Sequence, residues 1–201
     1  MLASGGHTAI IVVEDYDKFK ILGGTLDDAV GEAFDKVARV LGLNYPGGPN
    51  IEKLAREGKN NIEFPKMLKG VGGYNFSYSG LKTAVINYVH HANQTGERVN
   101  EADVACSFQH AATDILVKKA IEAAKEYSLD TVTVGGGVAA NGYMRENLGN
   151  ACAKCGLKLV LPEKILCTDN AAMIGAEGYV QYLKGNFADL TLNAAARVDL
   201  G

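Results

Sequence analysis

Glycines fall in clusters after the apolar runs of this 201-residue chain. Glycine makes up 24 of the 201 residues, about 12%, against roughly 7% in an average protein. Without side chains in the way, backbone N–H groups at such turns can approach an anion closely. The turns are therefore the first candidate binding elements. The clusters are Gly5-Gly6, Gly23-Gly24, Gly47-Gly48, Gly72-Gly73 and Gly135-Gly136-Gly137.

Strand and helix patterns alternate in the last third of the chain. Residues 131–134 and 158–161 have the composition of buried strands, and residues 141–154 and 170–183 have helical periodicity. This order predicts parallel strands covered by helices, and hence an α/β fold.

The first two thirds predict a hairpin followed by helices. Residues 9–13 and 19–22 have the pattern of paired strands, and Thr25 is a candidate cap for a helix over residues 27–41. Further helices are expected over 50–57, 81–92 and 101–127. We expect four segments: a hairpin and first helix (1–43), an irregular and helical insertion (44–127), a strand–helix–strand–helix unit (128–190) and a surface tail (191–201).

Charge and apolar patterning exclude several classes of protein. The net charge is −3 and the pI about 5.8, which gives no overall basic character typical of nucleic-acid binding, so any RNA substrate would be held by local charge or by a partner. No apolar run approaches the ~20 residues of a membrane span, and no signal peptide is expected, so we predict a cytoplasmic chain without membrane contact. Cys152 and Cys155 have CxxC spacing but lack the second ligand pair of a zinc site. Because free cysteine is among the most buried residue types, the cysteines are predicted to be buried thiols in a reducing compartment.

Two glycine turns carry the sharpest signals. Residues 4–8 (SGGHT) are either a plain hairpin turn or a backbone anion site, and the residues alone leave both open. In residues 134–141 a strand runs into three glycines and then a helix that starts at Asn141. This arrangement favours contact with a ligand ring or phosphate.

Three carboxylates are weaker candidates. Asp35 lies one turn before Arg39, which favours a solvated ion pair. Glu52 is a candidate acid in the first turn of a helix, where its charge would interact favourably with the positive end of the helix dipole. Asp169 is either a helix N-cap or, at the carboxyl end of a parallel sheet, a ligand to a metal or phosphate.

His90 and His91 are adjacent and are predicted to be surface residues.

Six segments together resemble one family. The chain closely resembles the tRNA N6-adenosine threonylcarbamoyltransferase family, formerly described as O-sialoglycoprotein endopeptidases. The resemblance implies an actin/Hsp70-like ATPase fold (ribonuclease H-like), of which this chain would be the second lobe with a helical insertion, the first lobe being mostly missing. The segments, in order, are 4–8 (SGGHT), 25–36 (TLDDAVGEAFDK), 45–49 (YPGGP), 76–83 (FSYSGLKT), 136–141 (GGVAAN) and 167–174 (CTDNAAMI).

The resemblance also implies an activity and a site. The family is an enzyme class that transfers the threonylcarbamoyl group from threonylcarbamoyl-adenylate to N6 of the adenosine next to the anticodon (position 37) in tRNA. It implies a divalent metal, iron or zinc, with Asp169 as one ligand, and an adenine nucleotide or the adenylate as bound ligand. It identifies no catalytic residue. The substrate-binding residues implied are Leu2, Ala3, Ser4, Gly5, Gly6, Asp35, Gly48, Glu52, Gly136, Gly137 and Asn141.

The chain departs from the family pattern at its start. Relatives begin with a lobe that carries a His-x-x-x-His pair of metal ligands, and this sequence contains no such pair. We therefore expect the isolated chain to be inactive in transfer. Expected partners are tRNA, a non-catalytic paralogue and a small ATPase, and a homodimer is left open. The alternative is a non-catalytic scaffold or dimerisation paralogue of the same fold, and a metalloprotease is disfavoured because several metal ligands are absent.

Overall fold

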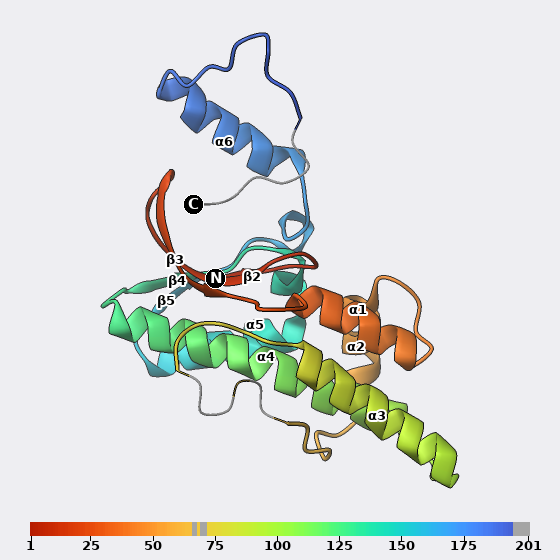
Figure 1. The fold of residues 1–201 in the computed structure, drawn as a ribbon. Coiled ribbons are helices and arrows are strands. Elements are labelled where there is room, and N and C mark those ends of the chain that lie inside the picture. Colours follow the sequence, from red (N-terminus) through yellow and green to blue (C-terminus); the bar gives the residue numbers. More distant parts are fainter. Residues whose placement is uncertain (66–67, 69–71, 195–201) are drawn as a thin grey trace. The chain divides into compact units, whose positions relative to one another are not determined.

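A computed structural model describes residues 1–65, 68 and 72–194, and the chain forms two compact units, Met1–Thr168 (unit 1) and Asp169–Gly201 (unit 2). This division falls inside the segment 128–190. Each unit is considered by itself (Figure 1).

Unit 1 opens with an antiparallel sheet of three strands in the order β1-β2-β3. These strands are β1 (Leu2–Ala3), β2 (Thr8–Asp15) and β3 (Lys18–Gly24). The first half of β2 alternates between buried and partly exposed positions, with Thr8, Ile10 and Val12 buried, as a half-buried strand requires. The predicted hairpin is confirmed.

The predicted parallel pair is also confirmed. Strand β4 (Thr131–Thr133) pairs with β5 (Lys158–Val160) in parallel, and the short 3₁₀ turn η1 (Gly137–Ala140) and helix α5 (Gly142–Lys154) connect them. A further 3₁₀ turn, η2 (Lys164–Leu166), follows β5. Leu2 forms an isolated parallel bridge with Gly135, so the start of the chain lies beside the end of β4.

Four helices fill the middle of the sequence and supply most of the core. They are α1 (Val30–Val40), α2 (Gly47–Ala55), α3 (Ser79–Thr95) and α4 (Glu101–Glu126). Helix α4, the long green helix of Figure 1, packs against α2, α3 and α5 and against strands β2 and β4. The ring of Phe108 on α4 meets that of Phe34 on α1 edge to face, with centroids 5.0 Å apart.

The start of α1 corrects one prediction. Thr25 does not cap this helix: its hydroxyl donates to the Asp28 carbonyl, and the helix begins only at Val30. The Val30 N–H instead donates to the Thr8 Oγ1 on β2, at 2.9 Å. A sequence pattern read locally could not find this cap, because the two residues are 22 positions apart.

Helix α2 begins earlier than predicted, at Gly47 rather than residue 50. The prediction that Glu52 is a first-turn acid is therefore wrong, since Glu52 lies in the middle of α2.

Unit 2 contains one described helix, α6 (Ala171–Leu183). Its N-cap is Asn170, whose side chain accepts a hydrogen bond from the Met173 N–H at 3.0 Å, so the N-cap role predicted for Asp169 is wrong. No residue of α6 is buried, although the helix is largely apolar. Among the described helices, none is both long and apolar enough to cross a membrane.

Candidate functional site

The opening loop and the glycine triplet lie against each other. The Ala3 N–H donates to the Gly135 carbonyl at 2.9 Å, and the Gly135 N–H donates to the Met1 carbonyl at 3.0 Å. Gly136 has a φ of 97°, and a Cβ there would lie 2.4 Å from the Ala3 carbonyl oxygen. Only glycine allows this approach, so two predicted binding turns form one structure.

The loop at residues 4–8 is a tight turn that leaves its glycines open. The Ser4 N–H donates to the His7 carbonyl at 2.8 Å, and the His7 N–H donates to Ser4 Oγ at 2.9 Å. Gly5 and Gly6 are exposed, and a Cβ on either would meet nothing within 4 Å. Within the described residues, neither glycine N–H donates a hydrogen bond. The loop is thus a hairpin turn whose shape also leaves two N–H donors free for an anion.

Helix α1 starts beside this turn. The Gly31 N–H donates to the Ser4 carbonyl at 3.1 Å, and a Cβ on Gly31 would lie 2.8 Å from the Gly5 backbone. The positive end of the α1 dipole therefore lies next to the open turn. Sequence analysis missed Gly31, although an isolated glycine inside a helical pattern is a known sign of close packing.

Asp35 connects α1 to α2. Its Oδ1 accepts a hydrogen bond from the Gly47 N–H at 2.7 Å, and a Cβ on Gly47 would lie 2.6 Å from the Asp35 Cα. The predicted ion pair with Arg39 is wrong: none of the ion pairs found in the described residues joins these two side chains. Asp35 thus holds the start of the helix that carries Gly48 and Glu52.

Glu52 connects α2 to α5. Its carboxylate pairs with Arg56 at 2.6 Å, and a Cβ on Gly142 would lie 2.8 Å from Glu52 Oε1. The Glu52 side chain is only 15% exposed. Glu52, an acid in the middle of α2, therefore reaches Gly142 in the first turn of α5, the residue that follows Asn141 in the sequence.

Asn141 starts α5, as predicted. Its Oδ1 accepts a hydrogen bond from the Met144 N–H at 2.9 Å, which makes it the N-cap of the helix. Its Nδ2 donates to Gln109 Oε1 on α4 at 2.8 Å, and both side chains are buried. Sequence analysis did not single out Gln109, because nothing in a helical pattern shows what a buried amide faces.

These contacts define one region, which we call the glycine junction. Four close contacts exist only because a glycine has no Cβ. They join the opening loop to η1 (at Gly136), the loop to α1 (Gly31), α1 to α2 (Gly47) and α2 to α5 (Gly142). The predicted residues in unit 1 therefore come together from four separate segments of the sequence. The junction comprises Ala3–Gly6, Gly31, Asp35, Gly47, Gly48, Glu52, Gly136, Gly137, Asn141 and Gly142.

Asp169 belongs to unit 2 and is exposed. In the described part of the chain, no three His, Cys, Asp or Glu side chains gather in a way that could hold a metal ion. Because tight zinc and iron sites need three or four protein ligands, these residues alone do not fit the metal that the resemblance implies.

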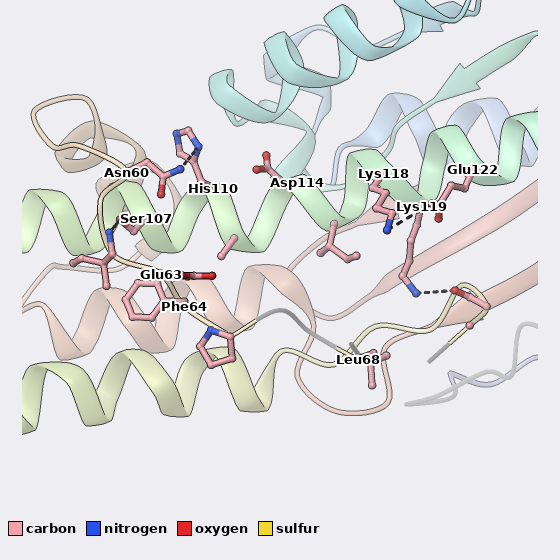
Figure 2. A pocket seen from close by; sticks show the side chains of 16 residues that line it. Asn60, Glu63, Phe64, Leu68, Ser107, His110, Asp114, Lys118, Lys119 and Glu122 are labelled. Atoms are coloured by element: carbon pink, nitrogen blue, oxygen red, sulfur yellow. Dashed lines mark hydrogen bonds and ion pairs between the residues drawn. The ribbon is translucent and has the colours of Figure 1, made fainter. Parts of the chain in front are cut away.

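A cavity of about 760 Å³ lies elsewhere in unit 1, and no predicted site residue lines it. Figure 2 shows it beside α4, with Asn60, Glu63, Phe64 and Leu68 on one side and His110, Asp114, Lys118 and Lys119 along the helix. Lys119 Nζ already donates to the carbonyls of Gly73 and Asn75, and burial lowers its pKa. Both carboxylate and ammonium side chains line the cavity, so its charge does not indicate one class of ligand.

The family description "TsaD: tRNA N6-adenosine threonylcarbamoyltransferase" matches residues 1–176. The chain belongs to this family. It is 54% identical to the tRNA N6-adenosine threonylcarbamoyltransferase of Moorella thermoacetica over 195 residues, which cover 96% of this chain and 57% of the relative. It is 48% identical to that of Staphylococcus aureus strain JH9 over 200 residues, which cover 100% of this chain and 59% of the relative.

Solved structures support the fold. The crystal structure of T. kodakarensis HypF matches with a TM-score of 0.57 and 25% identity, over 80% of this chain and 21% of that one. Full-length HypF in its phosphate- and nucleotide-bound form matches with a TM-score of 0.56 and 19% identity, over 79% of this chain and 24% of that one. The chain is α/β with an actin/Hsp70-like ATPase-type fold, and it spans less than three fifths of the length of the curated transferases it matches.

Proposed function

We propose that this chain supplies the adenylate-binding part of a tRNA threonylcarbamoyltransferase. The reaction would move the threonylcarbamoyl group from threonylcarbamoyl-adenylate to N6 of the adenosine at position 37 of tRNA, with release of AMP. The observation that carries this proposal is the glycine junction, where the open N–H groups of Gly5 and Gly6 lie beside the start of α1.

The chemistry expected of these residues is charge stabilisation and orientation. The leaving AMP gains negative charge on its phosphate, and free backbone N–H groups with a helix N-terminus favour such an anion. Gly136 packs against Ala3, and the next residue, Gly137, where a Cβ would meet only Thr168 Cγ2 at 3.8 Å, would offer backbone on which a ligand ring can lie flat. Asp35, Gly48, Glu52 and Asn141 would complete the walls and fix the adenylate for attack by the amine. We assign no general base.

The metal is a separate part of the proposal. Asp169 would contribute one carboxylate, and the remaining ligands would come from outside the described residues, which hold no such cluster. Bound there, iron or zinc would act as a Lewis acid. We accordingly propose that the 201-residue chain alone is inactive in transfer and that activity needs the remaining part of the transferase. We also propose tRNA, a non-catalytic paralogue and a small ATPase as partners, in the cytoplasm.

Titration of the 201-residue chain with AMP, followed by calorimetry, tests the adenylate assignment. We expect binding that weakens about tenfold in Asn141→Ala, the loss expected for one hydrogen bond. Under the alternative, a non-catalytic scaffold, the affinity for AMP would not depend on Asn141. A crystal soaked with an adenine nucleotide that left both glycine turns empty would contradict the proposal.

A transfer assay tests the claim of inactivity. The chain would be mixed with tRNA, threonylcarbamoyl-adenylate and the partner proteins, and modified adenosine would be measured by mass spectrometry. We expect none, and its appearance would show that the residues present suffice.

A further inference from the structure

A buried pair of side-chain amides lies behind the glycine junction. Asn141 and Gln109 are 7% and 5% exposed, and their side chains are joined by the 2.8 Å hydrogen bond from Asn141 Nδ2 to Gln109 Oε1. The two residues are 32 positions apart, so this contact exists only in the folded chain.

The direction of each amide is fixed by the backbone. The Met144 N–H can only donate, so the group facing it must be Asn141 Oδ1. Asn141 Nδ2 then faces Gln109, where only Oε1 can accept its hydrogen. One N–H of Asn141 Nδ2 is therefore used by Gln109. The other has no protein partner among the described residues and is available to a ligand acceptor.

Gln109 is itself held by the core. It lies in the first half of the 26-residue helix α4, and its backbone carbonyl accepts a hydrogen bond from the buried Thr113 hydroxyl at 2.8 Å. The preceding residue, Phe108, is fully buried against Phe34 of α1, next to Asp35. Gln109 is thus presented by a rigid element, which is what the precise orientation of a binding group requires.

We propose that Gln109 is a positioning residue: it orients the Asn141 amide so that its second N–H is directed to an acceptor atom of a bound nucleoside monophosphate. The inference rests on the proposed function, in which Asn141 contacts the adenylate. Gln109 does not itself touch the ligand. Loss of its acceptor frees the Asn141 side chain to turn away, and the affinity for the nucleotide falls.

The experiment uses the 201-residue chain and AMP, titrated by calorimetry. Gln109→Met keeps the length of the side chain and removes the acceptor, whereas Gln109→Glu keeps an acceptor. Ser107→Ala is the matched control, since Ser107 is a buried polar residue on the same helix whose hydroxyl bonds Ile62 and Lys59 rather than Asn141. Thermal melts of every variant establish that it is folded at the titration temperature.

We expect Gln109→Met to weaken AMP binding about tenfold, as Asn141→Ala does, and Gln109→Glu to restore most of the affinity. The double variant Gln109→Met/Asn141→Ala should bind no more weakly than Asn141→Ala alone, because Gln109 acts only through Asn141. Ser107→Ala should bind like the parent chain. Additive losses in the double variant, or an unchanged affinity in Gln109→Met, would overturn the inference while leaving the proposed function intact.

A second measurement does not depend on binding. In ¹H–¹⁵N spectra, we expect slow hydrogen exchange of the Asn141 side-chain amide in the parent chain and in Gln109→Glu, and fast exchange in Gln109→Met. Equal exchange in all three would overturn the inference even if AMP failed to bind. Failure of the parent chain to bind AMP, or parent-like affinity in Asn141→Ala, would instead refute the role of Asn141 and with it the route by which Gln109 acts.

Discussion

The two glycine turns of the junction use the same residue type in opposite ways. In the opening turn, Gly5 and Gly6 are exposed, and a Cβ added to either would meet nothing within 4 Å. In the turn after β4, Gly136 has a positive φ and lies against the Ala3 backbone. One turn keeps its backbone accessible, and the other lets two backbones touch. A glycine motif by itself therefore does not say whether ligand binding or packing requires it.

Gly136→Ala should give the largest effect. A Cβ there would clash with the Ala3 carbonyl, and the positive φ is strained for any residue with a Cβ. We expect unit 1 to lose about 3 kcal/mol or more of unfolding free energy. Urea denaturation followed by circular dichroism measures this. Gly137→Ala is the matched control, since its Cβ would meet only Thr168 Cγ2 at 3.8 Å, and an equal loss there would contradict the packing role.

Thr8→Val tests the flank of the opening turn. The variant keeps the shape of a side chain that is 2% exposed but removes the hydroxyl that accepts from the Val30 N–H. We expect a loss of about 1–2 kcal/mol in unfolding free energy, the usual cost of a lost helix cap. Thr25→Val should cost less in the same denaturation experiment. A larger loss of unfolding free energy in Thr25→Val than in Thr8→Val would show that Thr25 caps the helix, as the sequence alone predicted.

Gly6→Ala should separate binding from stability. Its Cβ would point into open space, so we expect the unfolding free energy to change by less than about 0.5 kcal/mol. The methyl group would keep an anion from the backbone, and we expect AMP affinity to fall about tenfold, or about 1.4 kcal/mol. Calorimetric titration and a urea curve on one preparation would measure both. A loss of stability without a loss of affinity would make the opening turn structural, like its neighbour.

A change of pH should move stability through a region outside both turns. Partial burial acts to raise the pKa of Asp27, but hydrogen bonds from Ser77, Ser79 and Tyr78 outweigh it and hold the pKa below its ordinary value of 3.8. Because the folded pKa is the lower one, this stabilisation is complete above the ordinary pKa and is lost as pH falls through the folded value.

Urea midpoints measured from about pH 3 to 7 would show this dependence. We expect Asp27→Asn to flatten the acid side of the curve by a small amount, and Glu97→Gln, which removes an exposed charge, to leave it unchanged. An unaltered curve in Asp27→Asn would show that these hydrogen bonds do not contribute.

Periodicity predicted the elements well because each is decided by neighbouring residues. Helix α4 was expected over 101–127 and is found at Glu101–Glu126, and the parallel pair of β4 and β5 was expected from the order of the patterns. The predicted capping residues were wrong at two helices. At α1 the cap is not Thr25 but the distant Thr8, and at α6 it is not Asp169 but its neighbour Asn170. Caps depend on a single hydrogen bond, which periodicity does not record.

The site was predictable only as separate pieces. The opening turn and the glycine triplet were visible as turns with open backbone, but nothing local shows that Leu2 pairs with Gly135. Asp35 and Glu52 entered through the family resemblance alone. Their contacts with Gly47 and Gly142 explain why: each carboxylate meets the backbone of another helix, far away in the sequence. The partner of Glu52 at helical spacing, Arg56, forms an ordinary ion pair that does not mark such a role.

The bond between Thr8 and Val30 has a consequence for the order in which the chain folds. Helix α1 has no capping side chain of its own, and its first amide finds an acceptor 22 residues earlier, on a strand. An excised peptide of the helix would fray at its beginning. In the growing chain, the first turn of α1 should therefore become stable only once Thr8 is held in place on β2.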